Sequence, residues 1–164
     1  MYEVASRDIP ARSVLRLKRS VQGTDRAWAF GKEFVAILRK HHLPAMEGRA
    51  GAVFCIYWGE VSDDSDGPVE WCRPVPTDQA EQLAGKVPEL ELRDEPAHRE
   101  AFIHLGPGGQ VEPAQWQLIS QSLHSWLEEH TVQPSQLGAR ITYLADPTTP
   151  EGQGPDCDFA VPIT

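Results

Sequence analysis

The sequence repeats itself at a constant offset of 88 residues, and this duplication constrains the fold more than any other feature. The offset aligns identical residues of uncommon types: Trp28 with Trp116, His42 with His130 and Pro74 with Pro162. Chance similarity between two amphipathic patterns is the alternative explanation, but the matches include rare residues and keep their order along the whole chain. We therefore expect two copies of one structural unit.

Each copy shows the same succession of a short strand, an amphipathic helix and two further strands. In the first copy these are 13–18, a helix containing 28–38, 52–58 and 69–75; in the second they are 101–105, 113–129, 140–144 and 157–163. Residues 7–10 are expected to form a turn, and the segment 76–99 to join the copies through a short helix.

Neither copy can bury a full core alone, because one helix covers only part of a small sheet. We therefore predict a single α+β domain over residues 1–164, a tandem pseudo-two-fold repeat of β-α-β-β units. Repeat one spans about residues 2–76, the linker about 77–89 and repeat two about 90–164. The units should form a mainly antiparallel sheet with both helices on one face and a central groove between them, where ligand pockets are common.

Composition excludes several classes of function. The 15 basic and 24 acidic residues give a formal net charge of −9, so direct nucleic-acid binding is not expected. The first residues lack the apolar stretch of a signal peptide, and no apolar run is long enough to suggest a membrane span. Three widely spaced cysteines fit neither a disulfide framework nor a zinc site. We expect a cytoplasmic protein that does not bind membranes, metal ions or cofactors.

The two closing strands each contain one carboxylate among apolar residues. Glu70 lies between Val69 and Trp71, and Asp158 lies before Phe159. Side chains alternate along a strand, so each carboxylate points away from the neighbouring aromatic ring. A partly desolvated carboxylate near aromatic rings would suit a lipophilic cation, whereas a carboxylate on a solvated strand would have no such role. Alternation alone leaves both orientations open.

Aromatic and apolar side chains around the predicted groove complete the candidate ligand-binding set. Together with Asp158 and Glu70, the set comprises Tyr143, Cys55, Tyr57, Ile141, Trp28 and Trp116. A tyrosine offers a ring and one hydroxyl to an otherwise apolar pocket. Each of these residues could equally be an ordinary member of the core. No nucleophile elbow, phosphate loop or metal-ligand motif is present, so we assign no catalytic residue.

Four stretches, in this order and spacing, resemble GyrI-like small-molecule-binding domains over nearly the whole chain. They are Asp8-Ile9-Pro10-Ala11, His104-Leu105-Gly106-Pro107, Tyr143-Leu144-Ala145-Asp146-Pro147 and Asp158-Phe159-Ala160-Val161-Pro162-Ile163. Members of that family form the effector-binding domains of bacterial MerR- and AraC-type multidrug regulators, and others stand alone. The resemblance implies a pocket for hydrophobic, cationic molecules.

The family's pocket residues are only partly present. Its closing-strand acid, usually glutamate, corresponds to Asp158, a second acid falls on Ile141, and a tyrosine after the Gly-Pro turn falls on Gly108. These departures weaken the hydrolase interpretation, which needs a carboxylate and an aromatic hydroxyl together to activate water. Glu70 from the other copy is a possible substitute charge.

The leading hypothesis is a standalone protein that binds hydrophobic, cationic small molecules for multidrug-type sensing or sequestration. One alternative is a hydrolase of reactive cyclopropane-bearing compounds, with Glu70 or Asp158 orienting water near Tyr143 or Tyr57. Another is a module that contacts gyrase or serves a transcription regulator as its partner. Of these, we predict binding rather than catalysis.

Overall fold

The computed structural model describes residues 1–44, 51–59, 66–106, 113–145 and 156–164, which form three α-helices, a short 3-10 helix and eight strands. The first half contains β1 (Ala5–Ile9), β2 (Arg12–Gln22), α1 (Thr24–Lys40), β3 (Phe54–Tyr57) and β4 (Asp66–Val75). A connection with η1 (Thr77–Gln79) and α2 (Ala80–Lys86) follows. The second half contains β5 (Glu91–Glu95), β6 (His98–Leu105), α3 (Pro113–Glu129), β7 (Arg140–Tyr143) and β8 (Cys157–Ile163).

All eight strands form one antiparallel sheet in the order β1-β6-β8-β7-β3-β4-β2-β5. The two repeats meet at the central pair β3 and β7, where Phe54 pairs with Thr142. These two residues are 88 positions apart, so the pseudo-two-fold axis passes between them. The predicted α+β fold with a mainly antiparallel sheet is confirmed.

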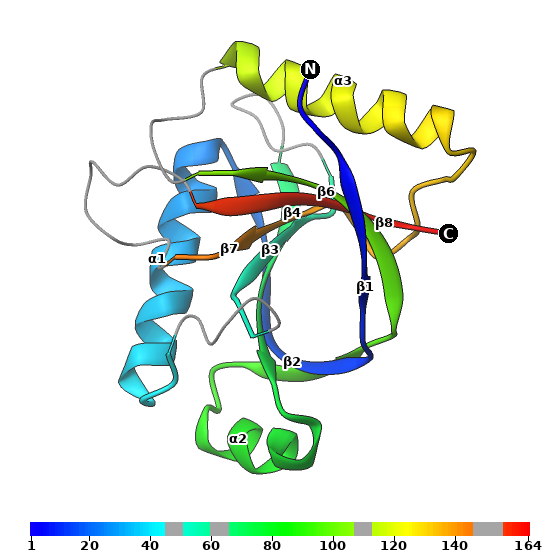
Figure 1. Cartoon of the computed structure of the whole chain (residues 1–164). Coiled ribbons are helices and arrows are strands. Elements are labelled where there is room, and N and C mark those ends of the chain that lie inside the picture. The colour runs from blue at the N-terminus through cyan, green and yellow to red at the C-terminus, as the bar shows by residue number, and fades with distance from the viewer. Residues whose placement is uncertain (45–50, 60–65, 107–112, 146–155) are drawn as a thin grey trace.

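Each repeat begins with one strand more than expected. The predicted turn at residues 7–10 is wrong, because its first three residues belong to β1. β1 pairs with β6 of the other repeat, and its counterpart β5 pairs with β2. Two-residue connections join β1 to β2 and β5 to β6, and such connections span only about 11 Å. These connections hold β1 close to β2 and β5 close to β6, although the strands of each pair are far apart in the sheet order. The sheet therefore curls (Figure 1).

Strand register shows that the constant offset fails in the closing strands. Opposite Phe54 and Thr142 lie Cys72 and Asp158, so Asp158 takes the place of Cys72 and not of Glu70. The second repeat reaches its closing strand in two residues fewer than the first. A shift of two keeps every side chain on the same face, which is why the apolar pattern concealed it.

The helices α1 and α3 pack on the same face of the sheet, on the outer side of its curve (Figure 1). Beneath α1 the core contains Leu15 and Trp71, and beneath α3 it contains Ile103 and Phe159. The opposite face lines the inside of the curve, where a smaller apolar cluster surrounds Phe54. Within the described ranges, no helix is long and apolar enough to cross a membrane.

Candidate functional site

The structure decides the orientation that the sequence left open. Trp71 and Phe159 pack beneath the helices, so Glu70 and Asp158 lie on the opposite face, inside the curve of the sheet. Neither carboxylate reaches solvent, because Glu70 is 1% exposed and Asp158 0%. The candidate residues therefore divide between two faces, and each face is described separately.

On the helix face, aromatic side chains gather where the two repeats meet. We name this set the central aromatic cluster: Trp28, Tyr57, Trp71, Trp116, Tyr143 and Phe159. Its floor is a row across four strands, in which Trp71 lies opposite Cys55 and Ile141 lies opposite Phe159. Tyr57 and Tyr143 pack against the cores of both repeats. The cluster thus bridges the duplication.

Ring contacts fix the positions of these side chains. Tyr143 stacks on Trp71 with 5.5 Å between ring centroids, and Trp28 lies 6.3 Å from Tyr143 in a tilted arrangement. On the second repeat, Trp116 meets Phe159 edge to face at 4.7 Å. Trp28 and Trp116 come from the early turns of α1 and α3 and are 39% and 42% exposed. They form the accessible rim of a cluster whose other members are buried, as Trp71 and Phe159 are, or half-buried, as Tyr57 and Tyr143 are.

The polar atoms of the central aromatic cluster are held neutral. Burial raises the pKa of Tyr57 and Tyr143 far above their ordinary range, and it does the same for the Cys55 thiol. Burial raises the pKa of Cys157, next to Tyr143, to about 12. At neutral pH these groups carry no charge, so the tyrosine hydroxyls of the cluster and the two buried thiols beside it are neutral.

On the inner face, Asp158 belongs to an ion-pair network. Arg7 Nη1 donates to one oxygen of Asp158 at 2.6 Å, and His104 Nδ1 lies 2.8 Å from the other. The same arginine pairs with Glu100 at 2.8 Å and covers the ring of Phe102 at 4.0 Å. The negative charge of Asp158 is therefore already compensated within the chain.

Glu70 is compensated in a similar way. Arg93 donates to one of its oxygens at 2.9 Å, and Trp58 Nε1 donates to the other at 2.9 Å. Arg16 lies 3.8 Å from the same carboxylate.

A third part of the inner-face network centres on Glu95. Arg140 Nη1 from the central strand β7 donates to Glu95 Oε2 at 2.7 Å, and Arg12 Nη2 donates to Oε1 at 2.8 Å. Both guanidinium groups lie over the ring of Phe54, at 5.0 and 4.5 Å. Because β5 is an edge strand and β7 a central one, this bridge ties the curled edge to the middle of the sheet.

Because of its buried carboxylates, the protein is expected to lose stability in acid. Burial alone would raise the pKa of Glu95 and Glu100, but ion pairs and hydrogen bonds with Arg12, Arg140, Arg7 and His98 outweigh it and lower both from the ordinary value of 4.5. A lowered folded-state pKa contributes stability above the unfolded-state value and loses it as the pH falls further. Urea unfolding between pH 6 and pH 3 should show a free energy of unfolding that declines below about pH 4.5. The Glu95→Gln variant should show a shallower decline, and an equal slope would contradict this assignment.

The candidate residues are only partly brought together. Six lie on the helix face in or beside the central aromatic cluster: Trp28, Trp116, Tyr57, Tyr143, Cys55 and Ile141. Glu70 and Asp158 lie on the inner face, so the expected arrangement of a carboxylate beside Tyr143 or Tyr57 is not formed. The hydrolase alternative needs a carboxylate beside a tyrosine. Among Glu70, Asp158, Tyr57 and Tyr143, no such pair is formed.

Sequence reasoning missed the arginine partners of these carboxylates. The sequence does contain a signal for such partners. In the segment 91–95, Glu91, Arg93 and Glu95 are two residues apart, alternate in charge and share one face of a strand. Opposite charges at such spacing indicate cross-strand ion pairs. The partner strands could not be inferred, because the crossed pairing of β1 and β5 was not expected.

Comparison with known proteins identifies the fold but gives no close relative. No family model matches the sequence, and no match was found among curated proteins. Among solved structures, the EcmrR C-terminal domain matches with a TM-score of 0.67 and 14% identity, covering 100% of this chain and 98% of that domain. The chain spans 57% of the EcmrR chain in its complex with DNA, at a TM-score of 0.70 and 14% identity.

Two further structures have the same architecture. SAV2435 bound to tetraphenylphosphonium matches with a TM-score of 0.56 and 9% identity, over 99% of this chain and 94% of that one. A hydrolase from Listeria innocua matches with a TM-score of 0.59 and 10% identity, over 99% of this chain and 92% of that one. The chain therefore has the GyrI-like fold, as the resemblance of its sequence predicted.

Proposed function

We propose that this chain binds hydrophobic, aromatic small molecules, cations among them, at the central aromatic cluster between α1 and α3. The observation that carries the proposal is the pair of exposed rings, Trp28 and Trp116, above a floor of buried aromatic side chains. Large exposed apolar residues grouped above aromatic side chains are typical of ligand sites. The tetraphenylphosphonium complex of SAV2435, which shares the fold, supports the same ligand class.

A cation at this site would be held mainly by ring faces. Each cation-π contact contributes about 0.5 to 2 kcal/mol, so two or three rings with their dispersion contacts can support micromolar affinity. Glu70 and Asp158 would add only a long-range electrostatic attraction, since arginines already compensate the charge of both. We therefore propose a preference for aromatic surface first and for positive charge second.

A matched pair of ligands tests both parts of the proposal. Tetraphenylphosphonium and tetraphenylborate have the same shape and opposite charge. Calorimetric titration should give a micromolar dissociation constant for the cation and an affinity at least tenfold weaker for the anion. Equal affinities would refute the preference for cations, and failure of both to bind would refute the site.

Variants locate the binding on one face of the sheet. Trp28→Ala and Trp116→Ala should each weaken tetraphenylphosphonium binding about tenfold, since each removes one ring from the rim. Trp58→Ala is the matched control, because Trp58 is 37% exposed but lies on the inner face and bonds to Glu70. Asp158→Asn should change the affinity less than threefold. A larger loss in Asp158→Asn than in the rim variants would place the site on the inner face instead.

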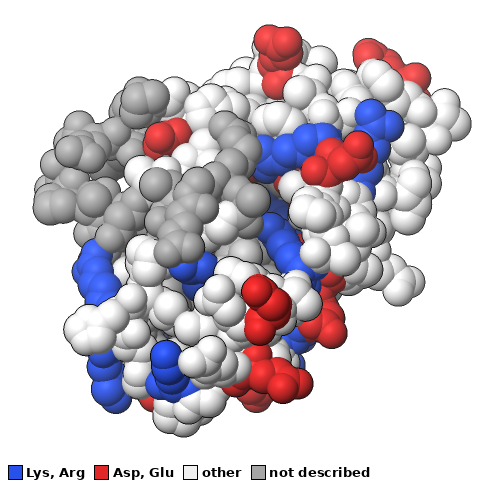
Figure 2. Space-filling view, turned by 60° about the horizontal axis from the view of Figure 1, so that its bottom comes forward, with Lys and Arg blue, Asp and Glu red and all other residues white. Residues whose placement is uncertain are grey.

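Sensing for a transcription regulator and sequestration both begin with this binding step. The match to EcmrR in its complex with DNA supports the sensing role. On the face seen in Figure 2, basic and acidic side chains lie interspersed, which supports binding of a small molecule rather than of nucleic acid by this domain. A gyrase-interacting module would instead retain gyrase on the immobilised chain without any ligand.

A further inference from the structure

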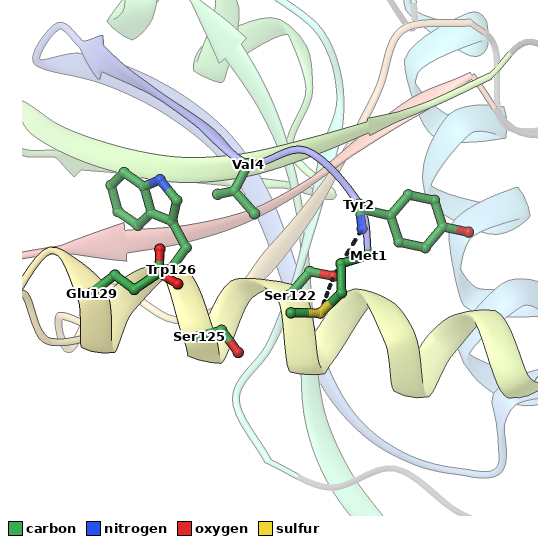
Figure 3. Close-up of a pocket in the computed structure, with 7 residues that line it drawn as sticks. All are labelled: Met1, Tyr2, Val4, Ser122, Ser125, Trp126 and Glu129. Atoms are coloured by element: carbon green, nitrogen blue, oxygen red, sulfur yellow. Dashed lines mark hydrogen bonds between the residues drawn. The ribbon is translucent and has the colours of Figure 1, made fainter.

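We propose that residues 1–4 form a strap that holds α3 on the sheet and regulates the ligand site, because docking of the strap is coupled to ligand binding at the central aromatic cluster. The coupling rests on the proposed function and concerns the regulation of that same site. The strap starts beside α3 and continues into β1 (Figure 1). Figure 3 shows its residues Met1, Tyr2 and Val4 along one flank of the helix.

Hydrogen bonds anchor the strap to α3. The backbone N–H of Tyr2 donates to Ser122 Oγ at 3.0 Å (Figure 3), and Gln115 Nε2 donates to the Tyr2 hydroxyl at 3.4 Å. Ser122 Oγ in turn donates to the carbonyl of Leu118 at 2.7 Å, which orients the hydroxyl as an acceptor for Tyr2. Ser122 is only 3% exposed, so water has little access to this anchor.

The strap and the ligand site belong to one packed unit. Tyr2 and Val4 pack against the core beneath α3, which also contains Ile119 and Phe159. Phe159 meets the rim residue Trp116 edge to face at 4.7 Å. Close-packed interiors transmit strain, so a displacement of α3 changes this ring contact. The position of Trp116 therefore depends on how α3 is held.

The strap and the ligand meet α3 from different flanks. Gln115 and Ser122, which bind the strap, are seven residues apart and so lie on one flank of the helix. Trp116 lies about 100° further round, on the side that contacts Phe159. The strap leads into the edge strand β1, whereas the central aromatic cluster lies over the inner strands β3 and β7. A ligand thus leaves the strap its space, and the coupling acts through the position of α3.

The first repeat holds α1 by a more buried attachment. The 88-residue offset places Glu89 and Leu90, ahead of β5, where Met1 and Tyr2 stand ahead of β1. Both carboxylate oxygens of Glu89 lie within 3.1 Å of His41 Nε2 at the end of α1, and Leu90 is 6% exposed. Met1, by contrast, is 78% exposed. Segments with few buried contacts are the ones that open locally, so the strap on α3 is the one suited to regulation.

Coupling between two sites is reciprocal. If a docked strap strengthens ligand binding by a given factor, the bound ligand strengthens docking of the strap by the same factor. Coupling factors of about fivefold are at the low end of those found between two sites of one protein. The strap can therefore be examined both through ligand affinity and through its own signals.

Ser122→Ala in the full chain tests the coupling, because it removes the acceptor of the Tyr2 N–H and leaves the central aromatic cluster intact. Calorimetric titration should show tetraphenylphosphonium binding weakened about fivefold. In methyl NMR, the Met1 and Val4 signals of the variant should move toward random-coil positions. Saturating tetraphenylphosphonium should return them toward their positions in the unaltered chain.

Ser125→Ala is the matched control. Ser125 lies on the same helix and lines the open depression beside the strap, but within the described residues it makes no hydrogen bond to the strap. Its replacement should change the affinity less than twofold. Tyr2→Ala removes the phenol ring from the strap itself, should weaken binding in the same direction as Ser122→Ala, and replaces that variant if it does not fold.

Each contrary outcome has a distinct meaning. Unchanged affinity in Ser122→Ala with displaced Met1 and Val4 signals would refute the coupling and leave the proposed function standing. Unmoved signals in that variant would refute the anchor. Equal losses in Ser122→Ala and Ser125→Ala would show that the affinity depends on α3 alone and not on the strap. Absence of binding by the unaltered chain would refute the proposed function and the coupling with it.

Discussion

Replacement of Arg140 by methionine is expected to lower the free energy of unfolding by about 3–5 kcal/mol, the largest effect of any single change considered for the inner face. The Arg140 side chain is 0% exposed, and its partner Glu95 is 1% exposed. Arg140 also donates to the carbonyls of Leu137 and Gly138. Its removal therefore takes one hydrogen-bond donor from each of three acceptors, which are these two carbonyls and Glu95 Oε2. A buried carboxylate with reduced compensation is strongly destabilising.

A double-mutant cycle with Glu95→Met measures the interaction energy between Arg140 and Glu95, separately from the effects of the two single substitutions. Removing both charges deletes the uncompensated carboxylate, so the double variant should recover a large part of the stability lost in Arg140→Met. Arg12 and Arg93, the other neighbours of Glu95, are 14% and 24% exposed and can turn their guanidinium groups toward water. Urea unfolding followed by circular dichroism gives all four free energies.

The exposed pair of Arg19 and Glu33 provides the control. Both side chains are nearly half exposed, at 45% and 48%, and such ion pairs contribute at most about 1 kcal/mol. Arg19→Met should therefore have a small effect. If Arg140→Met were equally mild, the bridge between the curled edge and the central strand would contribute little, and curling would depend on the short β1–β2 and β5–β6 connections alone.

Most of the fold could be predicted because its elements are encoded locally and repeated. The strand at Cys157–Ile163 and the helix at Pro113–Glu129 have the predicted bounds, since alternation and helical period are clear in these segments. The extra strand β1 was missed because Asp8, Pro10 and the polar residues between Ala5 and Ile9 favour a turn. Its pairing with the other repeat is a tertiary property that no local pattern contains.

The candidate site was predictable in its residues and not in its geometry. Alternation showed correctly that Glu70 and Trp71 lie on opposite faces, but the face covered by the helices depends on which side chains pack beneath them. Whether the charges of Glu70 and Asp158 are compensated depends on arginines from other strands. Which arginines lie beside these carboxylates follows from the register in which the strands pair. Charge compensation of this kind needs the pairing of strands to be known first.

Replacement of Gly31 by alanine is expected to destabilise the chain by about 2 kcal/mol, although alanine is the better helix former. A Cβ atom at this position of α1 would lie 2.4 Å from Cζ2 of Trp71 and below 3.0 Å from two further atoms of the same indole. Trp71 is 1% exposed and stacks between Phe34 and Tyr143, so the indole has no free direction in which to move. Overpacking should therefore outweigh the gain in helix propensity.

Gly85→Ala in α2 is the matched control, because a Cβ atom there would meet nothing within 4 Å. The same substitution should stabilise the chain by about 0.5–1 kcal/mol, so the two variants are expected to have opposite signs in thermal or urea unfolding. Gly31→Ala should also weaken tetraphenylphosphonium binding, since a displaced Trp71 moves Tyr143 at the centre of the aromatic cluster, while Gly85→Ala should not. A stable Gly31→Ala variant with unchanged affinity would show that the cluster tolerates movement of its floor, and the ligand would then depend on the rim residues Trp28 and Trp116 alone.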